Sequence, residues 1–131
     1  MEDTEIHEVS KNFDTIRDLV NLLEDVQQQF RIWHWNTKDW IHLATEEVYK
    51  GLIDPMDGLA ESFRAMTAKK YSRPDSKPTF ESEFDVTKAR LVCNTTIAQL
   101  NKVAKEIGDE GINGYIGDCV QLLRTCLYKL M

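Results

Sequence analysis

The stretch HWNTKDWIHLATEEVYKGLIDPMDGLAE, residues 34–61 of a 131-residue chain, joins a short polar turn to a long amphipathic pattern. Residues 36–39 are polar, and apolar residues then recur at steps of three and four, the period of an α-helix. These positions are Ile41, Leu43 or Ala44, Val48, Leu52, Met56, Leu59, Phe63 and Met66. A helical pattern also ends at this turn, so the sequence predicts a tight antiparallel pair of helices.

The pattern before the turn predicts one long helix. Apolar residues follow helical spacing from Phe13 to Trp33, which indicates a helix from about residue 4 or 10 to about residue 37. Helices of this length are typical of helical bundles. Pro55 falls within the helix after the turn, where it removes one backbone hydrogen bond, so we expect a bend there.

Two more helices are predicted after an irregular segment at about residues 71–84, which contains Pro74 and Pro78. Helical patterns cover about residues 86–107 and 110–130. We expect Gly108 to be a left-handed cap between them, and the glycines at 111, 114 and 117 to mark a close approach of helices. An extended loop of about 3.3 Å per residue can run along a bundle. We therefore expect one all-α domain, residues 1–131: a four-helix bundle with one long crossover between its second and third helices.

The composition disfavours several functional classes. The formal net charge is −6 and basic residues are not concentrated, so binding to nucleic acid or an anionic membrane is not expected. No apolar run approaches the roughly 18 residues of a membrane helix, and acidic residues follow Met1 where a signal peptide would be basic. We expect a cytoplasmic protein. Cys93, Cys119 and Cys126 lack metal-binding spacing and are expected as reduced core residues.

The histidines and carboxylates near the turn are the group of residues best suited to bind a metal ion. His34 ends the first helix and His42 begins the second, so the turn should place both imidazoles at one end of the bundle. Glu46 follows His42 by four residues and shares its helix face. Asp57 and Glu61 repeat this spacing on nearly the same face, but about 22 Å further along the helix. One metal ion therefore cannot contact both groups within one chain.

A second copy of the chain would remove this separation. If the second helix packs antiparallel against its mate across a two-fold axis, the His34, His42 and Glu46 end of one subunit meets Asp57 and Glu61 of the other. A mixed set of imidazoles and carboxylates suits iron, with zinc or manganese as alternatives. From spacing alone, a solvated acidic surface beside histidines that satisfy a helix interface remains the other interpretation.

The same region resembles a known family. The chain is similar to the first two helices of the Dps-type miniferritins, members of the ferritin-like superfamily, at His34-Trp35-Asn36, His42, Glu46, Tyr49, Leu52, Asp57 and Leu59-Ala60-Glu61. The segment Gly108-Asp109-Glu110-Gly111 and the apolar helix after it resemble the last helix of that family. The resemblance covers about residues 10–68 and 86–130, and it implies a ferritin-like fold.

The resemblance also implies a ferroxidase centre at the interface of two subunits. His34 and His42 would be imidazole ligands from one subunit, with Glu46 a nearby acid. Asp57 would bind or orient the metal from the other subunit, and Glu61 would be the main bridging carboxylate. The implied protein binds iron, oxidises Fe(II) with peroxide or oxygen and stores ferric mineral. It would be a homo-oligomer, at least a dimer, and a shell of twelve subunits if the family's assembly is kept.

Departures from the family pattern keep a second function open. The segment between the two histidines is shorter than the family's loop, and the crossover lacks room for the short extra helix found at the family's dimer interface. Pro55 also lies just before Asp57. The alternative is a ferritin-like bundle without iron chemistry that acts as a binding, assembly or inhibitor module, so the sequence leaves open whether the protein is an enzyme.

Overall fold

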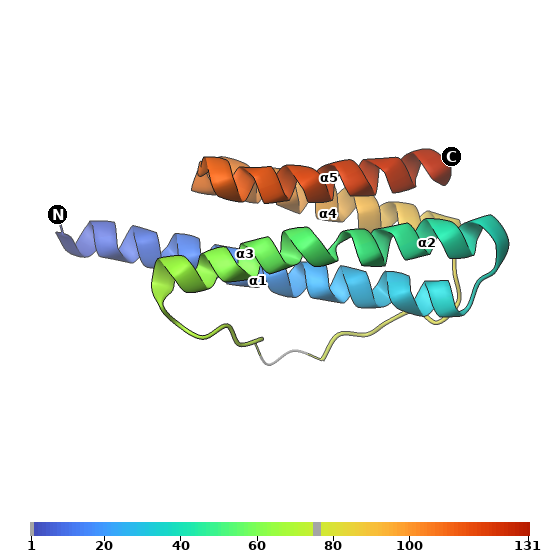
Figure 1. Cartoon of the computed structure of the whole chain (residues 1–131), viewed down its shortest axis with the longest axis horizontal. Coiled ribbons are helices and arrows are strands. Elements are labelled where there is room, and N and C mark those ends of the chain that lie inside the picture. Colours follow the sequence, from blue (N-terminus) through green and yellow to red (C-terminus); the bar gives the residue numbers. More distant parts are fainter. Residues whose placement is uncertain (1, 75–76) are drawn as a thin grey trace.

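The structure is a computed structural model that describes residues 2–74 and 77–131, with side chains of the first helix described from Phe13 onward. Asp75 and Ser76, in the predicted crossover, lie outside the described residues. Within the described part there are five α-helical segments and no strand: α1 (Glu2–Trp35), α2 (Asp39–Gly51), α3 (Ile53–Thr67), α4 (Val86–Ile107) and α5 (Glu110–Lys129). Because α2 and α3 together form the second helix of the bundle, the predicted all-α, four-helix architecture is confirmed (Figure 1).

The interruption between α2 and α3 follows from Pro55, as the sequence predicts. Pro55 has no N–H to donate to the carbonyl four residues earlier. The flanking bonds persist, because Leu52 donates to the Val48 carbonyl at 3.1 Å and Met56 donates to the Leu52 carbonyl at 3.0 Å. Leu52 itself keeps helical angles, with φ −76° and ψ −17°. The outward faces of α2 and α3 therefore remain nearly continuous.

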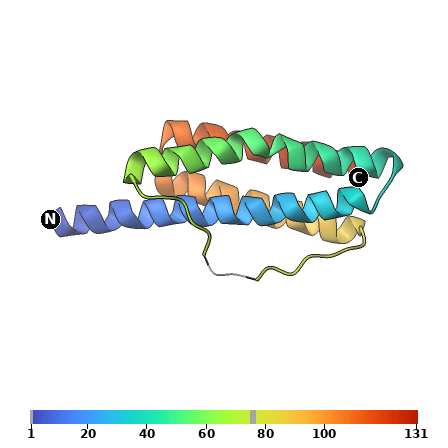
Figure 2. The same cartoon turned by 60° about the horizontal axis from the view of Figure 1, so that its bottom comes forward.

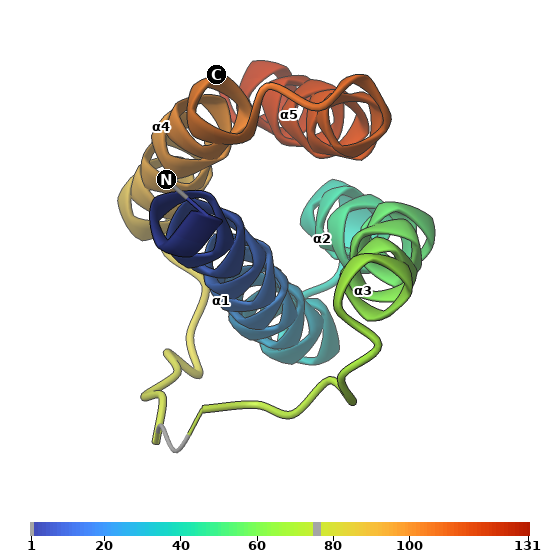
Figure 3. The same ribbon diagram turned by 90° about the vertical axis from the view of Figure 1, so that its left-hand side faces the viewer.

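The helix directions match the connectivity expected from a long crossover. α2 and α3 run antiparallel to α1, residues 68–74 and 77–85 lie along the bundle, and α4 then runs in the direction of α3 (Figures 1 and 2). α5 returns in the direction of α1. Both α1 and α5 pack against α4 and against the α2–α3 helix, so α1 and α5 lie diagonally opposite each other (Figure 3).

Apolar side chains from all five segments fill the centre of the bundle. The largest fully buried ones include Ile16, Leu23, Phe30, Trp33, Leu52, Leu59, Leu100, Ile116 and Leu123. The three cysteines are buried and free, which confirms their expected position in the core. No helix in the described part of the chain is long and apolar enough to cross a membrane.

The crossover is held against the outer side of α1 by hydrogen bonds to backbone groups (Figure 3). The Gln29 amide donates to the Glu81 carbonyl at 2.8 Å and accepts from the Glu81 N–H at 2.8 Å. The Trp33 indole donates to the Glu83 carbonyl at 3.0 Å. Further contacts join Asn36 to Ser82, and Arg73 to Glu24 and Asp25. The crossover is therefore fixed near both ends of its path along α1.

The glycines at the start of α5 only partly match the prediction. Gly108 is the left-handed cap of α4, with φ 61°, as expected, and Asp109 caps α5 through its side chain. A Cβ atom at Gly114 or Gly117 would meet no atom within 4 Å, and one at Gly111 would meet only the side chain of Asp109. The prediction that these glycines mark a close approach of helices is therefore wrong within this chain.

The close approach lies instead on the α2–α3 helix, where it packs against α5. A Cβ atom at Gly51 would lie 2.8 Å from the Leu122 side chain. One at Gly58 would overlap the Tyr115 ring, with its Cδ1 only 2.7 Å away. The α5 side chains fill the space that a larger residue would need, so these two glycines bring the helices together.

Candidate metal centre

The turn between α1 and α2 brings two histidines face to face. Only residues 36–38 separate the two helices. Thr37 donates from its hydroxyl to the Trp33 carbonyl at 2.7 Å, and Asp39 takes the left-handed conformation, with φ 62°, which Asp tolerates better than most residues. His34 and His42 consequently stack, with ring centroids 3.7 Å apart and ring planes at 24°. The predicted meeting of the two imidazoles at one end of the bundle is confirmed.

Backbone carbonyls fix the protonation pattern of both rings. The Nδ1 atom of His34 lies 2.9 Å from the His42 carbonyl oxygen, and the Nδ1 atom of His42 lies 2.7 Å from the His34 carbonyl oxygen and 3.1 Å from that of Thr37. A carbonyl oxygen can only accept, so each Nδ1 must carry the proton and donate it. In the neutral rings, both Nε2 atoms therefore keep a lone pair, the form in which imidazole binds a metal.

Two residues outside the predicted set support these rings. Tyr49 packs edge-on against His34 with ring centroids 5.1 Å apart, and the Arg31 guanidinium lies 5.4 Å from the centre of the Tyr49 ring. His34 is only 8% exposed as a result of this packing and the turn. The helical spacing of Arg31 and His34 is visible in the sequence, but the contact across two helices is not.

Glu46 lies beside the histidine pair and is held by Lys50. The two side chains form an ion pair one helical turn apart on α2. The hydrogen bond from Lys50 lowers the pKa of Glu46, and the positive charge of Lys50 lowers it further. Glu46 is consequently a carboxylate at neutral pH. The sequence analysis missed Lys50, although a Glu followed by Lys four residues later is a known signal for such a pair.

Asp57 and Glu61 lie on α3, exposed and apart from the histidine pair. Within residues 2–74 and 77–131, no group of three His, Cys, Asp or Glu side chains is placed so that it could hold a metal ion. The structure therefore brings His34, His42 and Glu46 into one neighbourhood and leaves the two α3 carboxylates outside it. This is the separation that helical spacing predicts for a single chain.

The two groups nevertheless share one outward face. At about 100° per residue, His42, Glu46, Asp57 and Glu61 fall within an arc of about 100° on the α2–α3 helix. Ile53 lies within the same arc, midway between the two groups, and is 43% exposed. The buried residues of this helix, such as Val48 and Leu59, point to the opposite side. The face thus combines metal-ligating residue types with an exposed apolar centre.

Comparison with known proteins supports the fold. No protein-family model matches the chain, and no curated protein matches its sequence. Among solved structures, the Dps protein of Vibrio cholerae O1 is similar, with a TM-score of 0.73 and 19% sequence identity over 95% of this chain and 89% of that one. That protein is described as a member of a broad superfamily of ferritin-like diiron-carboxylate proteins. The chain has the ferritin-like fold of Dps.

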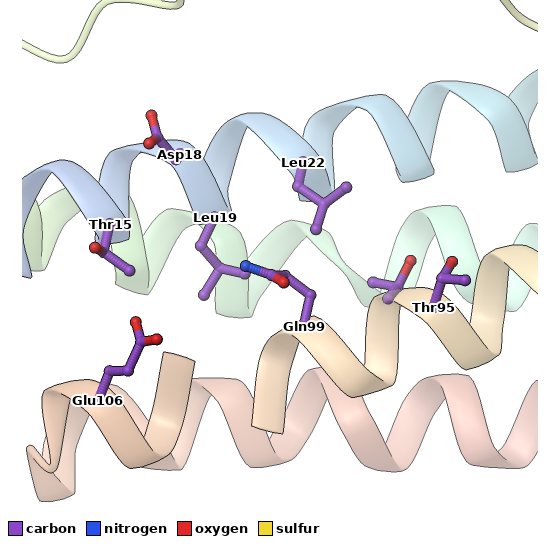
Figure 4. Close-up of a pocket in the computed structure, with 8 residues that line it drawn as sticks. Thr15, Asp18, Leu19, Leu22, Thr95, Gln99 and Glu106 are labelled. Carbon is purple, nitrogen blue, oxygen red and sulfur yellow. The ribbon is translucent and has the colours of Figure 1, made fainter. Parts of the chain in front are cut away.

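In this Dps-like fold the histidine turn is distinct from a groove between α1 and α4. That groove is a cavity of about 480 Å³, lined among others by Thr15, Asp18, Gln99 and Glu106. Figure 4 shows Glu106 pointing from α4 toward Thr15 of α1, while Asp18 points away from α4. None of the predicted metal ligands lines it. The histidine turn and the outward face of α2–α3 are therefore the better candidate site.

Proposed function

We propose that the protein is a Dps-like iron-binding protein that takes up Fe(II) as a substrate at sites shared by two subunits, oxidises it and stores the ferric product. The observation that carries this proposal is the orientation of the two imidazoles. Their Nδ1 atoms are engaged by backbone carbonyls 2.7–2.9 Å away, which leaves both Nε2 atoms free to accept. Carbonyl-oriented histidines of this kind are the usual support of a metal site.

The donor set fits iron. Imidazole nitrogen suits Fe, Zn and Mn alike, whereas hard carboxylate oxygens favour the higher charge of Fe(III) over Fe(II). His34 and His42 would supply the nitrogen ligands from one subunit, with Glu46 as an adjacent acid. Asp57 and Glu61 would supply carboxylates from the partner, Glu61 as the bridging group. No thiolate is near this set, which distinguishes it from a structural zinc site.

A two-fold axis would bring the two halves together. The midpoint between the His42–Glu46 group and the Asp57–Glu61 group falls near Leu52, so an antiparallel pair of α2–α3 helices would cross there. The exposed side chain of Ile53 would then meet its copy near the axis. Trp35 and Leu43, which are 63% and 59% exposed, add apolar surface near the histidine end. Burial of such a surface is the ordinary driving force for association.

Each residue of the site has a defined part in the reaction. Iron binding would draw Glu46 away from Lys50, and the carboxylates would neutralise the added charge. The bound Fe(II) would give up one electron per ion to peroxide or oxygen. The carbonyl contacts of the two Nδ1 atoms would hold the rings in place throughout. We further propose a homo-oligomer, a dimer at least and a shell of twelve subunits if Dps assembly is kept, working in the cytoplasm.

Metal titration of ligand variants tests this function. Under anaerobic conditions, Co(II) or Fe(II) should quench tryptophan emission, because Trp35 directly follows His34 in the sequence. His42→Ala and Glu61→Ala should each weaken binding at least about tenfold, the loss typical of a disturbed metal site, with unchanged helical content. Glu47→Ala is the matched control, since Glu47 neighbours Glu46 but pairs with Lys129 on α5. The proposal fails if all three variants bind metal like the parent protein.

A ferritin-like bundle without iron chemistry is the second candidate. The observation that favours it is the ion pair between Glu46 and Lys50, which already satisfies the carboxylate nearest the histidines. Stacked histidines bonded to each other's carbonyls can also serve only to stabilise the turn. Such a protein would act as a binding, assembly or inhibitor module. It predicts no quenching by Co(II) and no iron-dependent absorbance after Fe(II) is added in air.

A further inference from the structure

The α4–α5 hairpin places two of the three cysteines opposite each other. Cys93 of α4 is fully buried, and Cys126 in the last turn of α5 is 3% exposed. Both belong to the same hydrophobic core, and neither has a part in the candidate metal centre. α4 and α5 lie side by side as an antiparallel pair, so the position of each cysteine relative to the turn decides what it faces (Figure 3).

The buried residues of the hairpin match in mirror fashion. Each buried residue of α4, together with Ile107 at its end, lies the same number of residues before the turn as a buried partner lies after it. The pairs are Ala89 with Leu130, Cys93 with Cys126, Thr96 with Leu123, Leu100 with Cys119, Val103 with Ile116, and Ile107 with Ile112. In an antiparallel hairpin such pairs lie at the same height, so Cys93 and Cys126 face each other.

Two further observations place the sulfur atoms together. The thiols of Cys93 and Cys126 lie close enough to interact directly, so the protonation of each depends on the other. The α4 residues at this level, Ala89 and Cys93, are small, and helices packed through small residues approach closely. A disulfide needs Cα atoms roughly 4.4–6.8 Å apart, which facing small residues of such helices allow.

We propose that Cys93 and Cys126 form an intramolecular disulfide when hydrogen peroxide reaches the hairpin, and that this bond locks α4 to α5. Cys126 lies in the last turn of α5, where opening of the helix end gives a small oxidant access. The interaction with Cys93 and the positive charge of Lys129, one turn away, lower the pKa of Cys126 against the opposing effects of burial and of Glu47. Because opening of the helix end exposes it, we take Cys126 to be the sulfur that reacts first.

The step balances with peroxide as the oxidant. The Cys126 thiolate attacks one peroxide oxygen, the O–O bond breaks, and the departing hydroxide takes a proton to form water. The sulfur now carries a hydroxyl group. The Cys93 sulfur then attacks it, the S–S bond forms, the S–O bond breaks, and a second water leaves with the Cys93 proton. Two electrons pass from the two sulfurs to one peroxide, whether or not the protein oxidises iron.

Cys119 provides an internal control. It faces Leu100 in the hairpin rather than another cysteine, and burial raises the pKa of its thiol to about 12. A buried, protonated thiol reacts slowly with oxidants. Cys119 should therefore stay reduced while the folded chain is oxidised.

Peptide mapping of the full chain tests the proposal without any variant. The folded protein is treated with hydrogen peroxide, its remaining thiols are alkylated after unfolding, and trypsin is added. Cleavage after Lys and Arg separates the three cysteines into peptides 91–102, 106–124 and 125–129. We expect peptides 91–102 and 125–129 to be linked, two hydrogens lighter than their sum, and Cys119 to be fully alkylated. Two of the three thiols are then lost.

Variants supply a second measurement. Cys119→Ala should keep the linkage, whereas Cys93→Ala and Cys126→Ala should abolish it while circular dichroism shows unchanged helix. Chain oxidised in urea should instead give all three pairings. The inference is overturned if the folded protein gains oxygen atoms on sulfur with no linked peptides, if the link involves Cys119, or if it joins two chains.

Discussion

Tyr115 and Gly58 show how one missing side chain sets the distance between two helices. The Tyr115 ring of α5 occupies the place where a Cβ atom at position 58 would stand. Gly58→Ala should therefore destabilise the protein by about 1–3 kcal/mol through overpacking, despite the better helix propensity of Ala. The free energy of unfolding, measured by urea denaturation, checks this. In a Tyr115→Ala background the same change should become stabilising.

Gly114→Ala on α5 is the matched control at this scale. It makes the same chemical change in a helix, but a Cβ atom there meets no neighbour within 4 Å. It should raise the free energy of unfolding by up to about 1 kcal/mol. Equal effects of the Gly58 and Gly114 substitutions would contradict the packing account.

The histidine turn shows which features of the site could be predicted from the sequence and which could not. The sequence predicted that His34 and His42 meet at one end of the bundle, since that follows from a hairpin and helical spacing. It could not predict that each ring is bonded to the other's backbone carbonyl, because this depends on the angles of a three-residue turn. The α5 glycines were misinterpreted for a related reason: a spacing of three does not reveal which side of the helix faces a neighbour.

At the scale of elements, Gln29 of α1 attaches the crossover between α3 and α4 at Glu81. Gln29 is 7% exposed and makes two hydrogen bonds with the Glu81 backbone, one as donor and one as acceptor. Gln29→Ala should lower the free energy of unfolding by about 1–3 kcal/mol, because it removes two partly buried hydrogen bonds. It should also speed hydrogen exchange at the Glu81 amide.

Gln28→Ala tests whether this effect belongs to the crossover. Gln28 is the preceding residue of α1 and a similar substitution, but it does not bond to Glu81. Its removal should change the free energy of unfolding by no more than about 0.5 kcal/mol. If both variants exchange the Glu81 amide at the same rate, the crossover is held by other contacts.

The helices themselves were predictable, and the attachment of the crossover was not. The spacing of apolar residues predicted the bounds of α4 and α5 to within a residue or two. Pro55 predicted the interruption of the helix near Leu52. The partners of Gln29 and Trp33 are backbone carbonyls, which have no sequence signature. That the crossover runs along the bundle was expected from its length, but its position on α1 and its hydrogen bonds required the structure.

At the scale of the whole molecule, the account depends on a second copy of the chain. One chain carries the histidines at one end of the α2–α3 helix and the carboxylates at the other. The similarity to the Vibrio cholerae Dps protein concerns the fold, while the shared site stays a prediction drawn from spacing and from the exposed face around Ile53. A test of the central claim must therefore ask whether two different chains complete one site.

A mixed dimer of two variant chains, each lacking one half of the ligands, tests this directly. One chain carries His34→Ala and His42→Ala, and the other carries Asp57→Ala and Glu61→Ala. Each alone should lose Co(II) binding, since every site then lacks one half of its ligands. In a dimer of the two, one site receives no intact half, while the other receives intact histidines from one chain and intact carboxylates from its partner.

The decisive measurement is the anaerobic Co(II) stoichiometry of this mixed dimer, isolated with two different affinity tags. A site shared between subunits predicts recovery of half the sites of the parent dimer, with affinity close to that of the parent. No recovery in the mixed dimer, although the parent protein binds Co(II) and both variant chains pair normally, would contradict the shared site.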